Sequence, residues 1–162
     1  MKRSPSATER QHESTDDAQQ TALKLWVVLA RAYTSVSRHI EADIARSELT
    51  VAEFGILEVL YHKGPLLLGE IQRKILVSSG GVTYLVDRLT AKGLVERQDC
   101  PDDRRARYAV LTPEGEKFIK RIFPGHARAI QHALDGLTTE EQAEATALLR
   151  TLGRRAAELA EE

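Results

Sequence analysis

The stretch from residue 68 to residue 112 constrains the fold most, because the spacing of its apolar residues changes twice. Leu68, Ile71 and Ile75 recur at helical spacing, and residues 77–81 then interrupt the pattern with small and polar side chains. The helical period resumes with Val82, Leu85, Val86 and Leu89. Such a pattern predicts two short helices joined by a turn.

A β-hairpin is predicted directly after the second helix. Gly93 stands where a left-handed helix cap requires glycine. Residues 94–97 and 107–111 have the composition of two paired strands, and the polar residues 98–106 separate them. The whole stretch therefore reads as a helix-turn-helix followed by a hairpin.

The second helix has one apolar face and one face of small, hydroxyl-bearing and cationic residues. An α-helix fits the major groove of B-DNA, and the amide dipoles at its N-terminus favour a phosphate. The residues predicted to contact DNA here are Ser78, Ser79, Gly80, Gly81, Thr83, Tyr84, Arg88 and Lys92. A solvated face of an ordinary helix has a similar composition, so this helix alone does not decide the function.

The loop of the hairpin adds a second cationic element. Arg104, Arg105 and Arg107 gather at its tip, and planar guanidinium groups suit a narrow minor groove. We therefore include these three arginines among the predicted DNA contacts. A hairpin that binds only protein would have no need for all three.

The run DRLTAKGLVERQDCPDDRRARYAVLTPEG, residues 87–115, resembles the signature of MarR-type winged-helix regulators. The matching positions are Asp87, Arg88, Lys92, Gly93, Leu94, Arg97, Asp103, Arg105, Leu111, Thr112 and Gly115. The resemblance implies a mainly α fold with a small β-hairpin wing and long dimerisation helices. It also implies a homodimeric regulator of transcription that binds pseudo-palindromic double-stranded DNA, most often as a repressor.

Length and composition agree with this interpretation, whereas the net charge is a mild objection to it. A chain of 162 residues with 42% hydrophobic residues suits one domain with a core. The net charge is only -1, but residues 88–107 hold six basic and four acidic side chains, a local excess of +2. Residues 1–20 lack the apolar segment of a signal peptide and no membrane-spanning run is visible, so we expect a cytoplasmic protein without a membrane partner.

The N-terminal part predicts a tail and two helices. Residues 1–17 are polar, mixed in charge and without period, and we expect a disordered tail. In residues 18–44 the apolar positions fall on one stripe, which predicts a long amphipathic helix. Thr50 and Glu53 form a capping box that starts a helix at Val51, and Gly64-Pro65 ends it.

Two further helices are predicted after the hairpin. Thr112-Pro113 combines a helix cap with proline in the first helical position. Pro124-Gly125 falls within the stripe of this helix and predicts a kink or a short break. Thr138 and Glu141 form a second capping box, from which the last helix runs nearly to the C-terminus.

Together these elements predict a single domain, residues 18–162, after the tail. Residues 45–111 form its winged helix-turn-helix part, and residues 18–44 and 112–162 its dimerisation helices. The helices carry more apolar surface than one small domain can bury, which a second copy would cover. Two-fold symmetry would then require two DNA half-sites about one helical turn apart, roughly 34 Å.

The resemblance also implies a crevice between the dimerisation helices and the winged helix that holds a small aromatic or phenolic acid. Ring-bearing or titratable candidates for this crevice are Trp26, Tyr33, His39, His62 and His126. Ordinary packing is the more common role for each of these residues. The histidines lack the i, i+4 spacing of metal ligands and no CxxC accompanies them, so we predict neither a metal nor a cofactor.

Cys100 is the single cysteine, so the chain cannot form an internal disulfide. Nearby arginines would favour its thiolate, and oxidation in the wing could release DNA. A cysteine before proline is more commonly an ordinary loop residue, which leaves redox sensing as the weaker alternative.

An enzyme is not predicted, because the sequence has neither a phosphate-binding glycine loop nor a nucleophile motif. The alternative from another class is a winged helix that binds protein instead of DNA. The nearly neutral net charge leaves that alternative open.

Overall fold

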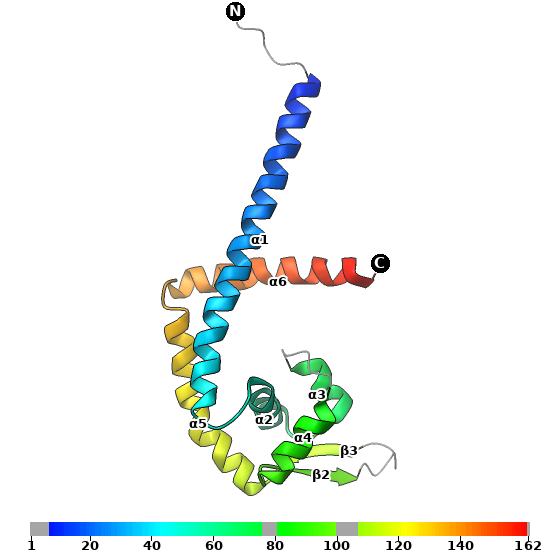
Figure 1. Cartoon of the computed structure of the whole chain (residues 1–162), viewed down its shortest axis with the longest axis vertical. Coiled ribbons are helices and arrows are strands. Elements are labelled where there is room, and N and C mark those ends of the chain that lie inside the picture. Colours follow the sequence, from blue (N-terminus) through cyan, green and yellow to red (C-terminus); the bar gives the residue numbers. More distant parts are fainter. Residues whose placement is uncertain (1–6, 76–80, 100–106, 162) are drawn as a thin grey trace, which may run out of the picture. The chain divides into compact units, whose positions relative to one another are not determined.

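The computed structural model describes residues 7–75, 81–99 and 107–161, with side chains for residues 16–75, 81–99 and 107–160. The chain divides into two units, Met1–Arg38 and His39–Glu162, each of which is described by itself. Six α-helices and three short strands lie in the described residues, so the predicted mainly α fold with a small β wing is confirmed (Figure 1). None of these helices is long and apolar enough to cross a membrane.

The first helix, α1, spans Ala7–Ala45; its residues up to Arg38 belong to the first unit, and the residues from His39 on belong to the second. It begins eleven residues before the predicted Ala18, so the prediction of a disordered tail is wrong for residues 7–17. These residues are polar but include the helix formers Ala, Glu, Arg and Gln, and extending an existing helix costs far less than nucleating one. Residues 1–6 lie outside the described part of the chain.

Helix α2, Val51–Lys63, starts with the predicted capping box. The Thr50 backbone N–H donates to Glu53 Oε2 at 2.8 Å, and the Glu53 N–H donates to Thr50 Oγ1 at 3.2 Å. Gly64 ends the helix with a φ of 76°. The capping box thus fixes both the start of α2 and the orientation of the Glu53 side chain.

The helix-turn-helix consists of α3, Leu68–Lys74, and α4, Val82–Ala91. The predicted Gly93 cap is confirmed, since Gly93 has a φ of 71° and the Leu94 N–H donates to Leu89 O at 3.0 Å. The turn at residues 76–80 lies outside the described residues.

The sheet has three antiparallel strands in the order β1-β3-β2. Strands β2, Val95–Asp99, and β3, Arg107–Leu111, form the predicted hairpin. Strand β1, Leu66–Leu67, pairs with β3 and corrects the prediction of a two-stranded ribbon. Two residues are too few to show the alternating pattern by which a strand is recognised in a sequence.

Helices α5, Pro113–Ala133, and α6, Thr139–Glu161, complete the second unit. Pro124 lies inside a continuous α5, which excludes the predicted break, and the ribbon of α5 curves along its length (Figure 1). Proline removes one backbone donor, which the adjoining turns tolerate here. The second predicted capping box is present, with the Thr138 N–H on Glu141 Oε2 at 2.8 Å and the Glu141 N–H on Thr138 Oγ1 at 3.2 Å.

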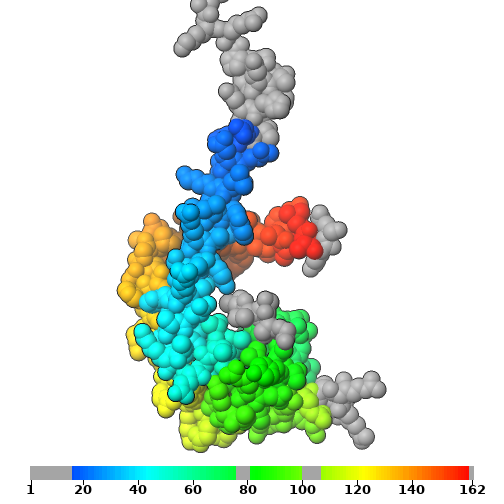
Figure 2. Space-filling view, in the orientation of Figure 1, coloured from blue at the N-terminus to red at the C-terminus, as the bar shows by residue number. Residues whose placement is uncertain are grey.

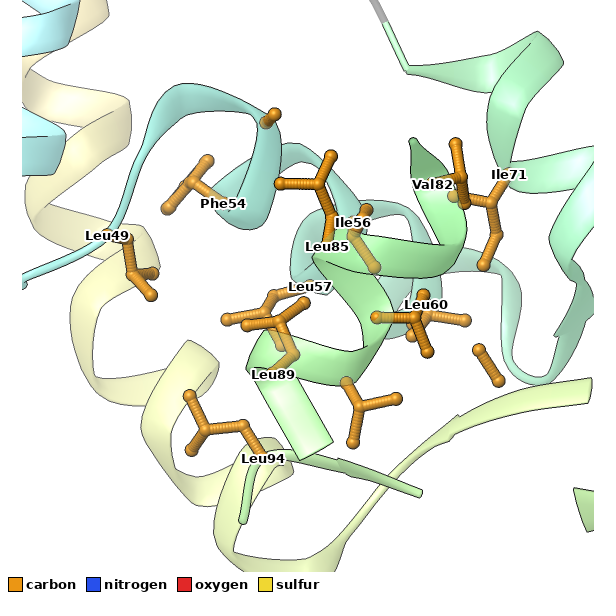
Figure 3. Close-up of a cluster of buried hydrophobic side chains, with 14 of the residues drawn as sticks. Leu49, Phe54, Ile56, Leu57, Leu60, Ile71, Val82, Leu85, Leu89 and Leu94 are labelled. Carbon is orange, nitrogen blue, oxygen red and sulfur yellow. The ribbon is translucent and has the colours of Figure 1, made fainter. Parts of the chain in front are cut away.

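The hydrophobic core lies within the second unit and is built by the winged helix, α5 and the C-terminal end of α1. Its largest fully buried apolar side chains come from α2, α3, α4, β2 and α5: Ile56, Leu57, Ile71, Val86, Leu89, Val95 and Ile119. Figure 3 shows how side chains of α2 and α4 face one another across it. One face of α4 therefore packs against the core, and its other face is left for solvent or a partner.

Candidate nucleic-acid interface

Helix α4 presents the two faces that its sequence predicts. Val82, Leu85, Val86 and Leu89 are buried, and the first, second and last of these point into the core in Figure 3. The predicted contacts Thr83, Tyr84, Arg88 and Lys92 are exposed, and Gly81 is the N-cap. Ser78, Ser79 and Gly80 lie outside the described residues. The exposed face has the small and polar character that approach to a DNA groove requires.

Two cations of this face reach back to one buried carboxylate. Arg88 Nε and Lys92 Nζ each lie 3.2 Å from Glu53 Oε1, and the Glu53 side chain is fully buried. Lys92 Nζ also donates to the backbone oxygen of Glu48 at 2.8 Å. Sequence reasoning assigned Glu53 only to the cap of α2, and it missed this second role because the cations lie more than thirty residues further along the chain.

Burial disfavours the charged form of Glu53 and by itself raises the pKa of its carboxyl group. The hydrogen bond from the Thr50 backbone N–H, the Lys92 ammonium and the Thr50 side chain together outweigh burial. The pKa of Glu53 is therefore below the usual value for glutamate, and the group is ionised in the folded protein at neutral pH.

This lowered pKa predicts a stability that depends on pH. Glu53 binds a proton more readily in the unfolded state than in the folded state. The ionised carboxylate therefore stabilises the fold fully at pH values above the ordinary glutamate pKa, and this stabilisation is lost as pH falls through the pKa of Glu53 in the folded protein. We expect the difference in unfolding free energy between wild type and Glu53→Gln to shrink between about pH 6 and pH 3. Urea denaturation of both proteins across that range measures it. A difference that stays constant or grows in acid would contradict the assignment.

Arg97 ties the wing to the exposed face of α4. From β2, it forms an ion pair with Asp87 at 2.9 Å, and its Nη2 donates to the backbone oxygen of Thr83 at 3.2 Å. Asp87 and Thr83 lie one turn apart on α4, so one side chain bridges strand and helix. The arrangement fixes the hairpin against the helix that it follows.

A pair of opposite charges joins the two strands at the end of the hairpin nearest the loop. Arg107 Nη1 lies 3.0 Å from Asp99 Oδ1, and the two residues are partners in the register of β2 and β3. Arg107 therefore supports the hairpin as well as adding positive charge beside it. Arg104, Arg105 and Cys100, predicted as wing-tip contacts and as a redox site, lie outside the described residues.

Two of the five predicted ligand residues line one pocket. A pocket of about 510 Å³ lies among the end of α1, α2, the end of α3 and α5, and His62 and His126 belong to its lining. His126 is buried, with its Nδ1 3.2 Å from Asp43 Oδ2 and its ring centroid 4.2 Å from that of Phe54. Ile40, Ile44, Val59, Ile75 and Ile130 supply much of the apolar remainder.

The other three ligand candidates lie elsewhere. The ring of His39 stands 5.7 Å from that of His132, and neither residue lines the pocket. Trp26 and Tyr33 are exposed on the part of α1 that forms the first unit. The pocket therefore involves His62 and His126 but not His39.

Comparison with known proteins decides the family. Residues 47–106, which hold the helix-turn-helix and the start of the wing, match the model described as the MarR family. The HTH-type transcriptional regulator MhqR of Bacillus subtilis is 42% identical over 132 residues, which are 82% of this chain and 91% of that protein. The chain belongs to the MarR family.

Solved structures place this MarR-family chain in the same fold. Sco3205 of Streptomyces coelicolor, a MarR family transcriptional regulator solved in complex with DNA, superposes with a TM-score of 0.74 at 26% identity and covers 94% of this chain and 90% of its own. BpsR of Bordetella bronchiseptica, whose DNA binding is regulated by 6-hydroxynicotinic acid, gives a TM-score of 0.71 at 28% identity and covers 78% and 90%. The fold is that of winged helix-turn-helix regulators.

Proposed function

We propose that this MarR-family chain is a homodimeric, sequence-specific DNA-binding regulator that represses nearby genes. The observation that carries the proposal is the exposed face of α4, on which Thr83, Tyr84 and Arg88 are presented by a helix packed on its opposite side. The DNA complex of Sco3205 supports DNA as the partner. Such a function requires the protein to be cytoplasmic, and no catalytic step belongs to it.

Exposed apolar side chains support the homodimer. Helix α1 exposes Leu23, Trp26 and Tyr33, and α6 by itself exposes Leu148, Leu149, Leu152 and Leu159. Contiguous apolar surface of this kind marks an interface in soluble proteins. The C-terminal half of α6, red in Figure 2, projects from the rest of the second unit. A second copy would cover it, and two-fold symmetry would make the operator pseudo-palindromic.

The pocket around His62 and His126 supports release by a small molecule. Its apolar lining and two imidazole rings suit a small aromatic or phenolic acid, the class to which the ligand of BpsR belongs. The dimer has one state whose recognition helices are spaced for DNA and another whose helices are wrongly spaced. A ligand that binds the second state more tightly lowers DNA affinity, and the size of the effect is set by the difference between its affinities for the two states. Oxidation of Cys100 is the weaker alternative for release, and that residue lies outside the described part.

Fluorescence anisotropy tests the proposal. The wild-type protein first selects a duplex of about 30 base pairs from a random library, long enough for two half-sites one turn apart. Binding to this selected duplex and to a scrambled duplex is then measured over a salt series. Salicylate, a small phenolic acid, is titrated into the complex with the selected duplex to test whether it releases the DNA. We expect tight, salt-sensitive binding that prefers the selected duplex. Failure of folded, dimeric protein to bind either duplex at low salt would favour a protein-interaction module instead.

The wing-tip assignment predicts a defined effect of Arg105→Ala. Loss of one phosphate or minor-groove cation should weaken binding to both duplexes and reduce the slope of log affinity against log salt by about one. Thr83→Ala, on the exposed face of α4, should instead change the preference between duplexes. Arg150→Ala on α6 serves as a control with the same charge change. Equal affinities of Arg105→Ala and wild type would remove Arg105 from the interface.

A further inference from the structure

Glu53 joins the first turn of α2 to the recognition helix α4. Its Oε2 accepts the Thr50 backbone N–H at 2.8 Å, so the carboxylate is oriented by the cap of its own helix. Its Oε1 lies 3.2 Å from both Arg88 Nε and Lys92 Nζ. One carboxylate therefore serves two helices, and each of its oxygens has a different task.

The contact at Oε1 is an ion pair, because two cationic nitrogens lie 3.2 Å from this buried carboxylate oxygen. A buried charge without compensation is strongly unfavourable, so both cations are held over the carboxylate. Arg88 lies in the last turn of α4, and Lys92, four residues further along, is its C-cap. Both ion pairs fix the C-terminal end of α4 to α2.

The same contacts restrict the two cationic side chains. Lys92 is held from a second side by the backbone oxygen of Glu48. Arg88 uses Nε for Glu53, its guanidinium lies 5.9 Å from the centre of the Tyr84 ring, and 42% of its side chain is exposed. The two terminal nitrogens of a guanidinium held at Nε remain suited to a bidentate contact with guanine or phosphate.

We propose that Glu53 is a positioning residue for operator recognition, whose buried carboxylate holds Arg88 and the C-terminal end of α4 in the arrangement that reads DNA. The inference rests on the proposed function. Ordering Arg88 before binding reduces the entropy lost in a specific contact. Non-specific attraction to phosphates does not need that order and is weakened by the nearby negative charge.

Glu53→Gln separates the charge from the cap, because glutamine serves as well as glutamate in a capping box. We expect its affinity for the duplex selected by wild type to fall roughly tenfold, which is the size of one lost base contact. Its affinity for the scrambled duplex should stay the same or rise. Equal losses on both duplexes would indicate general structural damage and would overturn the proposal, as would an unchanged preference.

Glu70→Gln is a matched control. Glu70 Oε2 accepts the Leu67 backbone N–H at 3.0 Å, so this residue caps α3 as Glu53 caps α2. No ion pair of Glu70 is found within the described residues. Its replacement removes the same charge from the helix-turn-helix, and we expect the preference for the selected duplex to persist. A similar loss of preference in Glu70→Gln would overturn the specific role of Glu53.

Arg88→Gln completes a double-mutant cycle. If Glu53 acts through Arg88, adding Glu53→Gln to Arg88→Gln should cost much less preference than it costs in wild type, and additive losses would overturn the proposal. Should Glu53→Gln fail to fold, Lys92→Gln perturbs the same carboxylate from its exposed side. The preference of Lys92→Gln for the selected duplex should fall too. An equal loss of affinity on both duplexes would contradict the positioning role of Glu53.

The two proposals fail in different ways. A folded wild-type protein that does not discriminate between the selected and scrambled duplexes would overturn the proposed function, and this inference with it. A wild-type protein that discriminates, with Glu53→Gln discriminating equally, would overturn only the role of Glu53.

Discussion

Replacement of Gly115 by alanine is expected to lower the free energy of unfolding by about 3 kcal/mol or more. A Cβ at this position would lie 1.9 Å from the backbone oxygen of Leu94 and 2.8 Å from its carbonyl carbon. Backbone atoms cannot turn aside as the end of a long side chain can. The first turn of α5 would have to move away from the segment that joins α4 to the wing.

Urea denaturation followed by circular dichroism measures the effect. Gly125→Ala is the matched control in the same helix, since the nearest atom to its Cβ is the end of the Arg128 side chain at 4.0 Å. We expect this control to be neutral or slightly stabilising, because alanine favours a helix over glycine. Similar unfolding midpoints for the Gly115 and Gly125 variants would show that α5 does not approach Leu94 so closely.

The close approach at Gly115 gives a physical reason for threonine at position 112 and glycine at position 115, at the end of the run that resembles the family signature. Thr112 Oγ1 donates to the backbone oxygen of Gly93 at 2.7 Å and accepts the Gly115 N–H at 2.9 Å. The Thr112 N–H donates to Leu94 O at 3.1 Å. Threonine thus caps α5 and fastens it to the turn after α4, and glycine is needed because the two backbones meet there.

Features that depend on neighbouring residues were predictable from the sequence. The capping boxes at Thr50 and Thr138 and the glycine cap at Gly93 each involve a few successive residues, and the structure contains all three. The two faces of α4 were predictable for the same reason, because helical periodicity alone decides which side chains are buried.

Features that depend on distant residues were not predictable. Nothing near Glu53 in the sequence indicates that its partners are Arg88 and Lys92, because the fold alone brings the two helices together. Likewise, five candidates for a ligand crevice had similar chemistry, and only the packing of α2 and α5 distinguishes His62 and His126 from His39. The two-residue β1 becomes recognisable only through its pairing with β3.

A negative charge on the apolar stripe of α6 is expected to abolish tight operator binding. In Leu152→Glu, a carboxylate replaces a leucine that is 42% exposed in the single chain and that shares its stripe with Leu148 and Leu159. If this stripe is covered in a homodimer, burying the unpaired charge is too costly and the subunits separate. Each monomer then binds one half-site, and the affinity for the selected duplex should fall roughly hundredfold or more.

Sedimentation velocity measures dimerisation and anisotropy measures DNA affinity, and both are carried out on the same samples. Arg150→Gln is the matched control, since it also lowers the net charge by one and lies on the opposite face of α6. It should remain dimeric and bind the operator as wild type does. A dimeric Leu152→Glu protein with full affinity would exclude this stripe from the interface. A monomeric variant with full affinity would contradict the two-half-site argument itself, because a single recognition helix would then provide all the binding.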